Sequence, residues 1–245
     1  MNRHAVQQFF PDTYSFFRDC SAEHPFWREM KNVHLNDAKK GNTLLSDLEQ
    51  AFSSLHLFDG EHIMQQRLIQ VDSSEELLEA LTHLYVAYLY RHHHSRFVNE
   101  KEHNYDIELE IADQLLALGV VHFKNFESLT SQFEDEIQAD IQHMEQVNGT
   151  GESEFIQRLH QKAQNLGEHP TAHHQVLVAV TSQAHFPRQF ALVEHLRATR
   201  NLSEELFPHV AGVLLIDPTP GREHASFIPF HVEGHELEEL LNKRG

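Results

Sequence analysis

Residues 105–126 read YDIELEIADQLLALGVVHFKNF. Here the hydrophobic pattern has the two-residue period of a strand, whereas the residues before it have the period of a helix. Apolar residues at 105, 107, 109 and 111 alternate with acidic residues at 106, 108 and 110, which predicts a strand with one buried face. Gly119 introduces a second alternating run, rich in β-forming residues, over 120–126. With a short strand expected over 95–98, this region predicts three strands in succession.

A strong helix signal precedes these strands. Ser73 is a suitable N-cap, Glu75 and Glu76 are acidic residues in the first turn, and an apolar stripe runs from 77 to 89.

Residues 1–70 read as helices and loops. We expect them to form a helical N-terminal extension packed on an α/β domain over 71–245. An aromatic stretch within 9–27 is expected to be an arm over the sheet, and if exposed it would be a surface for a partner or a second copy of the chain.

After the strands, the pattern predicts helices over 128–147 and 152–166, a strand over 176–180 and a helix over 188–198. Strands over 210–216 and 225–230 and a short acidic helix over 234–245 follow. Almost wholly apolar strands are typical of the centre of a sheet, and alternating ones are half exposed. The expected fold is therefore α/β, with a mixed central sheet and helices on both faces.

Composition limits the classes of function. The 245 residues include 19 Lys and Arg against 37 Asp and Glu, a net charge of −18, which disfavours a surface devoted to nucleic acid. A single cysteine, Cys20, excludes an intramolecular disulfide and favours a reducing compartment, so a cytoplasmic location is expected. The sequence contains no run of about 18 apolar residues, so no membrane span is expected.

Several site types are absent or weakly indicated. The sequence has no Gly-x-Ser-x-Gly elbow and no glycine-rich phosphate loop. The 22 histidines include candidates for imidazole metal ligands, but chance clustering of solvated or helix-terminal histidines is the favoured explanation. Those candidates are His92, His93, His94 and His103, and separately His224, His231 and His235.

The order of the predicted elements from Glu75 to Phe230 resembles the PD-(D/E)XK nuclease superfamily, which has a restriction-endonuclease-like core of helix, three-strand meander, helix and strand. In that family the second strand carries an Asp and the third an acidic residue two positions before a Lys. The positions that match are Asp106 on the second strand and Lys124 on the third. His122 stands in place of the second carboxylate, and Glu79, or Glu76, is the acid of the first helix.

The resemblance implies a metal-dependent hydrolase that cleaves phosphodiester bonds of nucleic acid, with Asp106, Lys124 and Glu79 as catalytic residues. It implies Mg²⁺ or Mn²⁺ held by Asp106, His122 and Glu108, with Glu110 as another acid that could complete the site. Because His122 is a poor magnesium ligand, the activity is expected to be weakened or lost.

Two alternatives stay open. The acidic residues 106, 108 and 110 could be the solvated face of an amphipathic strand, with Lys124 as a cross-strand partner. The scaffold could also serve a non-enzymatic interaction or regulatory protein that binds a protein partner or forms a homo-oligomer.

Overall fold

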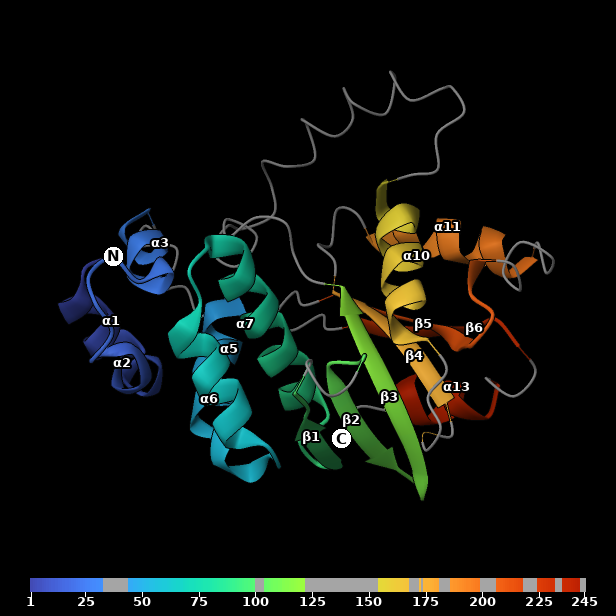
Figure 1. Cartoon of the computed structure of the whole chain (residues 1–245), viewed down its shortest axis with the longest axis horizontal. Helices are drawn as coiled ribbons and strands as arrows, with labels where there is room; N and C mark the ends of the chain where they lie inside the picture. The colour runs from blue at the N-terminus through green and yellow to red at the C-terminus, as the bar shows by residue number, and fades with distance from the viewer. Residues whose placement is uncertain are drawn as a thin grey trace.

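A mixed six-stranded sheet forms the centre of the structure, and helices cover both of its faces (Figure 1). The computed structural model describes residues 1–32, 44–99, 104–121, 154–167, 172, 174–180, 186–198, 206–217, 224–231 and 235–242. The helix expected over 128–147 and the candidate residues His122 and Lys124 lie outside the described residues.

Helices make up the chain before the sheet. They are α1 (Arg3–Phe9), α2 (Pro11–Phe17), α3 (Pro25–Asn32), α5 (Leu44–Ser53), the short 3₁₀ helix η1 (Leu55–Leu57), α6 (Glu61–Gln70) and α7 (Ser74–Leu89). The sheet and its remaining helices are β1 (His94–Phe97), β2 (Ile107–Ile111), β3 (Gln114–Val121), α10 (Glu154–Leu166), β4 (His174–Val180), α11 (Phe186–Ala198), β5 (Val210–Asp217), β6 (His224–Pro229) and α13 (His235–Asn242). The α/β class expected from the sequence is confirmed.

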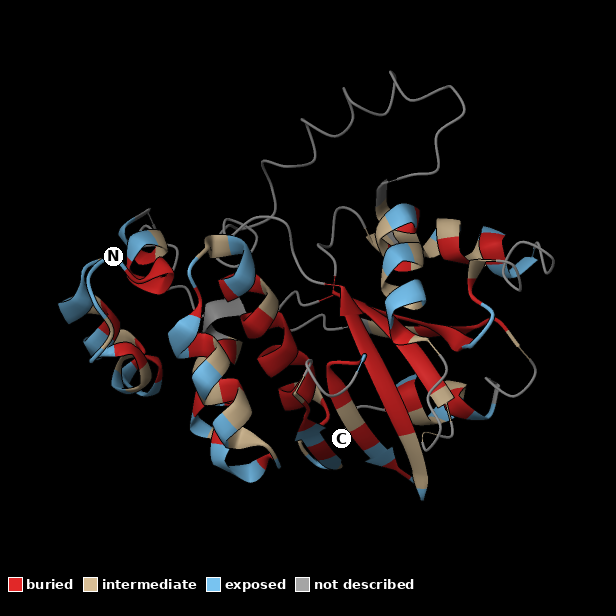
Figure 2. Ribbon diagram, in the orientation of Figure 1, coloured by how far each residue is buried: buried red, intermediate tan, exposed pale blue. Residues whose placement is uncertain are grey.

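The strands lie in the sheet in chain order, from β1 to β6. The pairs β1/β2, β2/β3 and β5/β6 are antiparallel, and β3/β4 and β4/β5 are parallel. Parallel strands need a crossover, which α10 supplies between β3 and β4 and α11 supplies between β4 and β5. The central strands are buried along nearly their whole length, as Figure 2 shows.

Each central strand sends alternate side chains into two separate cores. On β3, Leu118 and Val120 belong to the core formed with α7, the N-terminal helices and α13, whereas Ala117 and Val121 belong to the core formed with α10 and α11. The alternation of faces is a direct result of the two-residue period of a strand. The helices before residue 71 share the first core, in which Phe17, Trp27 and Leu68 are almost completely buried.

The expected start of the third strand is wrong. Gly119 was expected to introduce that strand, but β3 begins at Gln114 and Gly119 lies inside it. Ala112 and Asp113 both have positive φ angles, and they turn the chain tightly from β2 into β3. The glycine is needed because a Cβ at 119 would lie 2.9 Å from the Leu166 side chain of α10.

Both outer strands of the sheet are shielded from edge pairing. Along β1, Asp59 bonds to the strand through Asp59 N–H to the Ser95 carbonyl (3.2 Å) and Phe97 N–H to the Asp59 carbonyl (2.9 Å). On β6, the Phe227 N–H donates to Asn242 Oδ1 of α13 at 2.8 Å.

A buried histidine joins the first helices to α6. His24 Nδ1 accepts from the Phe26 N–H (3.2 Å), so in the neutral ring Nε2 carries the proton and donates it to the Leu68 carbonyl (3.1 Å). Burial lowers the pKa of His24, although the carbonyls of Leu68 and Ile69 oppose the shift. Protonation of His24 at Nδ1 would turn that nitrogen from an acceptor into a donor, and it would then face the Phe26 N–H, which is also a donor.

We therefore predict that His24 makes the protein less stable as the pH falls. Its lowered pKa means that the unfolded chain takes up the proton first, so stability is lost below the ordinary histidine pKa of about 6.5. Urea unfolding of wild type and His24→Gln at pH 7.5 and pH 5.5 measures this contribution, since Gln keeps an N–H donor but does not titrate. The wild type is expected to lose more stability than the variant between the two values. Equal losses would contradict the assignment.

Candidate functional site

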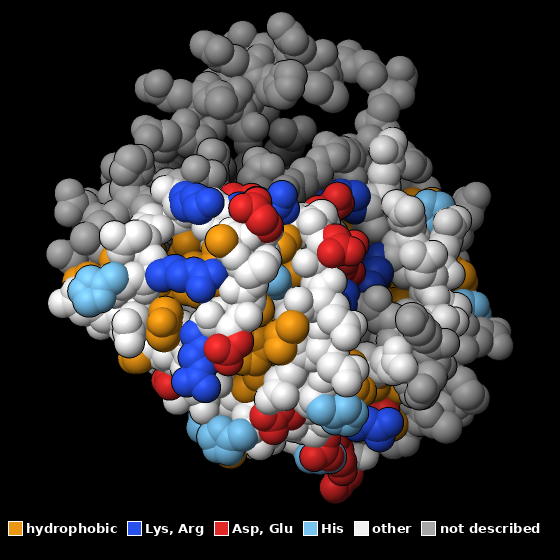
Figure 3. All heavy atoms as spheres, turned by 60° about the vertical axis from the view of Figure 1, so that its left-hand side comes forward, with side chains coloured by type: hydrophobic (Ala, Val, Ile, Leu, Met, Phe, Trp, Pro, Cys, Tyr) orange, Lys and Arg blue, Asp and Glu red, His pale blue; other side chains and the backbone are white. Residues whose placement is uncertain are grey.

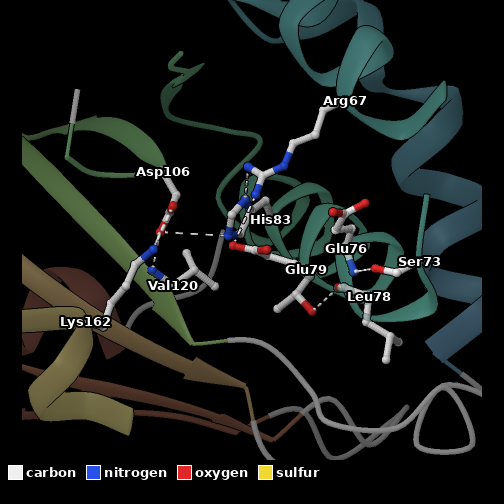
Figure 4. A network of polar contacts seen from close by, with 10 residues as sticks. Arg67, Ser73, Glu76, Leu78, Glu79, His83, Asp106, Val120 and Lys162 are labelled. Carbon is white, nitrogen blue, oxygen red and sulfur yellow. Dashed lines mark hydrogen bonds and ion pairs between the residues drawn. The ribbon is translucent and has the colours of Figure 1, made fainter. Parts of the chain in front are cut away.

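Four charged or ionisable side chains from three helices gather around the carboxylate of a fifth residue (Figure 4). The carboxylate belongs to Asp106, which immediately precedes β2 and is 3% exposed. Its neighbours are Arg67 of α6, Glu79 and His83 of α7, and Lys162 of α10. We call this set of five residues the Asp106 cluster.

Asp106 is fixed by the first antiparallel pairing of β2 with β3. Its N–H donates to the Leu118 carbonyl (2.9 Å), and its side-chain Oδ2 accepts from the Val120 N–H (2.6 Å). Its two chain neighbours belong to opposite cores. Tyr105 lies in the core that includes α10, and Ile107 lies in the core that includes α7. The carboxylate therefore lies where helices from both faces of the sheet can reach it. This burial rules out the alternative in which Asp106 lies on a solvated strand face.

The helix α7 presents Glu79 and His83 on one side, because residues four positions apart lie one above the other. Its start is fixed by Ser73, whose Oγ accepts from the Glu76 N–H (3.1 Å), and by Glu76, whose Oε2 accepts from the Asp72 N–H (2.8 Å). Glu76 is therefore a capping residue of the helix. Glu79 is the α7 acid that belongs to the Asp106 cluster.

Glu79, His83 and Asp106 each place one ligand atom within 4.8 Å of the others. Two carboxylate oxygens and an imidazole nitrogen are a usable donor set for a divalent metal, and the nitrogen favours manganese or zinc over magnesium. Of the three, His83 is fully buried, Asp106 nearly so, and Glu79 is partly open to solvent. Entry to such a site would therefore be from the side of Glu79.

The chain's own cations already contact these ligands. Lys162 Nζ lies 2.8 Å from Asp106 Oδ1 and 2.7 Å from Oδ2. Arg67 donates through Nη1 to His83 Nδ1 (2.7 Å) and pairs through Nη2 with Glu79 Oε1 (3.2 Å). Two carboxylates are thus balanced by two cations within the cluster.

The tautomer of His83 follows from these contacts. A guanidinium has no acceptor, so Nδ1 of His83 must be the acceptor and the neutral ring carries its proton on Nε2. That nitrogen lies 3.8 Å from Asp106 Oδ2, which is too far for a hydrogen bond.

The other residues predicted from the sequence lie apart from this group. Glu108 Oε2 accepts from the Tyr105 hydroxyl (2.9 Å), and its Oε1 lies 3.7 Å from Arg96 of β1. This acceptor contact and burial raise the pKa of Tyr105, burial having the larger effect. Glu110 is exposed and pairs with His94, which also bonds to Asp59. Neither glutamate belongs to the group whose ligand atoms lie close enough to Asp106 to share one ion with it.

Of the sequence-predicted residues, the structure brings Asp106 and Glu79 together. Sequence reasoning missed His83, Arg67 and Lys162. A weak signal existed for His83, because it lies four residues after Glu79 and interrupts an apolar stripe. The sequence carries no such signal for Arg67 or Lys162, since each reaches the cluster from another helix.

Among the described residues, Glu79, His83 and Asp106 are the group whose ligand atoms lie close enough together to hold one ion. Of the histidines proposed from the sequence, His103 and the side chains of His224 and His235 lie outside what the structure describes.

Comparison with known proteins adds no relative. The chain matches no family model, and no curated protein or solved structure is significantly similar to it. No described helix is long and apolar enough to cross a membrane.

We predict that Asp106→Asn lowers the free energy of unfolding by about 2 kcal/mol, because the ion pair with Lys162 and the charged acceptor of the Val120 N–H are both lost. The matched change Glu194→Gln breaks a more exposed pair with Arg197 (2.6 Å) and should cost about 0.5 kcal/mol or less. Urea unfolding of the three proteins measures both values. Similar losses in the two variants would show that the Asp106 cluster does not hold the fold together.

Proposed function

We propose that the chain is a nuclease-like protein that binds a divalent metal at Glu79, His83 and Asp106 and acts as a weak metal-dependent phosphodiesterase on nucleic acid. The observation that carries the proposal is the approach of these three ligand groups to within 4.8 Å, with Lys162 beside them. Two of the three are acids that the family resemblance expects: Asp106 on the second strand and Glu79 on the first helix.

The topology supports this proposal. The elements α7, β1, β2, β3, α10 and β4 follow one another as helix, antiparallel three-strand meander, helix and parallel strand. That is the element order of the restriction-endonuclease-like core. Asp106 lies at the start of the second strand, and the acid of the preceding helix faces it.

The residues that would hold the metal suit a transition metal. A divalent ion in such a site polarises a phosphoryl oxygen and activates water. Around it, the protein's own groups orient and balance charge: Val120 N–H fixes Asp106, and Lys162 supplies an ammonium group. His83 would ligate the metal once its contact with Arg67 opens, because that contact occupies Nδ1 and keeps the proton on Nε2. A lysine in this place can stabilise the charge of a phosphate, which is the role that the resemblance gives to Lys124.

Weak catalysis is expected because His122 stands where the resemblance places the second carboxylate. The residue of β3 whose backbone contacts the Asp106 carboxylate is Val120, an apolar residue with no ligand atom in its side chain. A site with one carboxylate fewer holds a hard cation less tightly. The imidazole of His83 compensates for softer metals only.

A second function, a non-enzymatic interaction protein, is favoured by the charge distribution. The net charge is −18, and on the face drawn in Figure 3 the Lys and Arg side chains lie among Asp and Glu side chains rather than in a continuous basic surface. Within the Asp106 cluster, Arg67 and Lys162 already balance both carboxylates. A protein partner or a second copy of the chain would then take the place of nucleic acid.

Calorimetric titration of metal-free protein with Mn²⁺ and Mg²⁺ separates the two functions. We expect Mn²⁺ to bind about tenfold or more tightly than Mg²⁺, because His83 contributes a nitrogen ligand. Glu79→Gln should abolish Mn²⁺ binding, whereas the matched change Glu110→Gln, at an exposed carboxylate, should leave it unchanged.

Cleavage of single-stranded and duplex DNA and of RNA is then measured with the metal that binds. Mn²⁺-dependent cleavage that is lost in Glu79→Gln supports the phosphodiesterase. Absence of Mn²⁺ binding, or binding that survives in Glu79→Gln, would contradict it and favour the interaction protein.

A further inference from the structure

Lys162 makes both of its short contacts to one carboxylate. Its Nζ lies 2.8 Å from Asp106 Oδ1 and 2.7 Å from Oδ2, so the ammonium group bridges the two oxygens in the way a bound cation does. A metal ligated by Asp106 would need at least one of these oxygens. While the ammonium bridges both oxygens, it opposes a divalent ion at either of them, because the two positive charges repel strongly in a site of low dielectric constant.

The two cations of the Asp106 cluster differ in how readily they can leave. Arg67 contacts His83 and Glu79 at once through its rigid planar fork, and it must release His83 before that ring can ligate a metal. Lys162 is a compact charge at the end of a flexible stem, and its side chain is 19% exposed although its partner is 2% exposed. Its ammonium can therefore rotate toward solvent without being stranded in the core.

The helix that carries Lys162 stays in place without this contact. Ile156, Leu159 and Leu166 of α10 are buried in the second core, and a Cβ at Gly119 would collide with Leu166, so helix and strand are in close contact. Loss of the ion pair would free the Lys162 side chain but leave α10 packed on β3 and β4.

We propose that Lys162 is a built-in counter-ion that keeps the Asp106 carboxylate closed and is displaced when a divalent metal binds. This inference rests on the proposed metal site at Glu79, His83 and Asp106. It makes the resting protein self-inhibited, since metal binding must overcome an ion pair inside the chain. The affinity for metal is then set by competition between Lys162 and the ion as well as by the ligands.

The test is Mn²⁺ titration of the full chain carrying Lys162→Met, with binding followed by calorimetry. Removing the competing ammonium should tighten Mn²⁺ binding by about tenfold or more relative to wild type. Arg158→Met is the matched control, because it removes a cation of α10 one turn away whose charge partner is Glu75 rather than Asp106. That control should change the affinity much less than Lys162→Met.

Thermal unfolding supplies a second readout that does not depend on activity. Without Mn²⁺, Lys162→Met should melt at a lower temperature than wild type, since Asp106 loses its balancing charge. Saturating Mn²⁺ should restore more stability to the variant than to wild type. If Lys162→Met does not fold, Lys162→Gln keeps a hydrogen-bond donor without the charge and is titrated in its place.

The failures of the two proposals are distinguishable. If wild type binds Mn²⁺ and Lys162→Met binds it equally or more weakly, Lys162 is not a competitor and this inference is overturned while the metal site stands. If neither protein binds Mn²⁺, the metal site is wrong and the inference falls with it. An equal gain in Arg158→Met would show a general charge effect and would also overturn the specific role of Lys162.

Discussion

The carboxylate of Asp106 connects parts of the chain that the hydrophobic cores keep separate. The two cores lie on opposite faces of the sheet, and Asp106 lies between residues that belong to one core and the other. It accepts from the backbone of β3 and from the ammonium of α10, and it lies close to the imidazole of α7. A buried charge is tolerable only when it is paired, so α7, β3 and α10 are positioned in part by one side chain.

This constraint has a chemical consequence. The same pairing that makes Asp106 acceptable in the interior also occupies the oxygens that a metal would use. A site that binds metal readily keeps its carboxylates poorly balanced, and a stable core keeps them fully balanced. The Asp106 cluster lies near the second state, which accounts for both the compact packing around it and the weak activity that we propose. In the function that we propose, activity therefore depends on how easily one ion pair opens.

Local patterns predicted much of the fold. The alternation at 107–111 specified β2, and Ser73 with its acidic neighbours specified the start of α7. The apolar runs at 176–180 and 210–216 located the central strands. The start of β3 was missed because Gly119 looks like a break in sequence, whereas its reason is the close approach of Leu166 from a distant helix.

The candidate site was only partly predictable for a similar reason. Asp106 and Glu79 follow from the order of the elements and from acids at suitable places. Lys162 is 56 residues from Asp106 in the chain, and its contact arises from the way α10 packs on β3. Such long-range pairs are set by packing, and no local spacing or propensity encodes them.

The most direct test is a crystal structure of the protein grown with Mn²⁺, with anomalous diffraction used to locate the metal. The account predicts an anomalous peak among Glu79, His83 and Asp106, with Lys162 Nζ moved beyond hydrogen-bond distance of the Asp106 carboxylate. Mn²⁺ bound only at other places, or at this place with the Lys162 contact of 2.7 Å intact, would contradict the account.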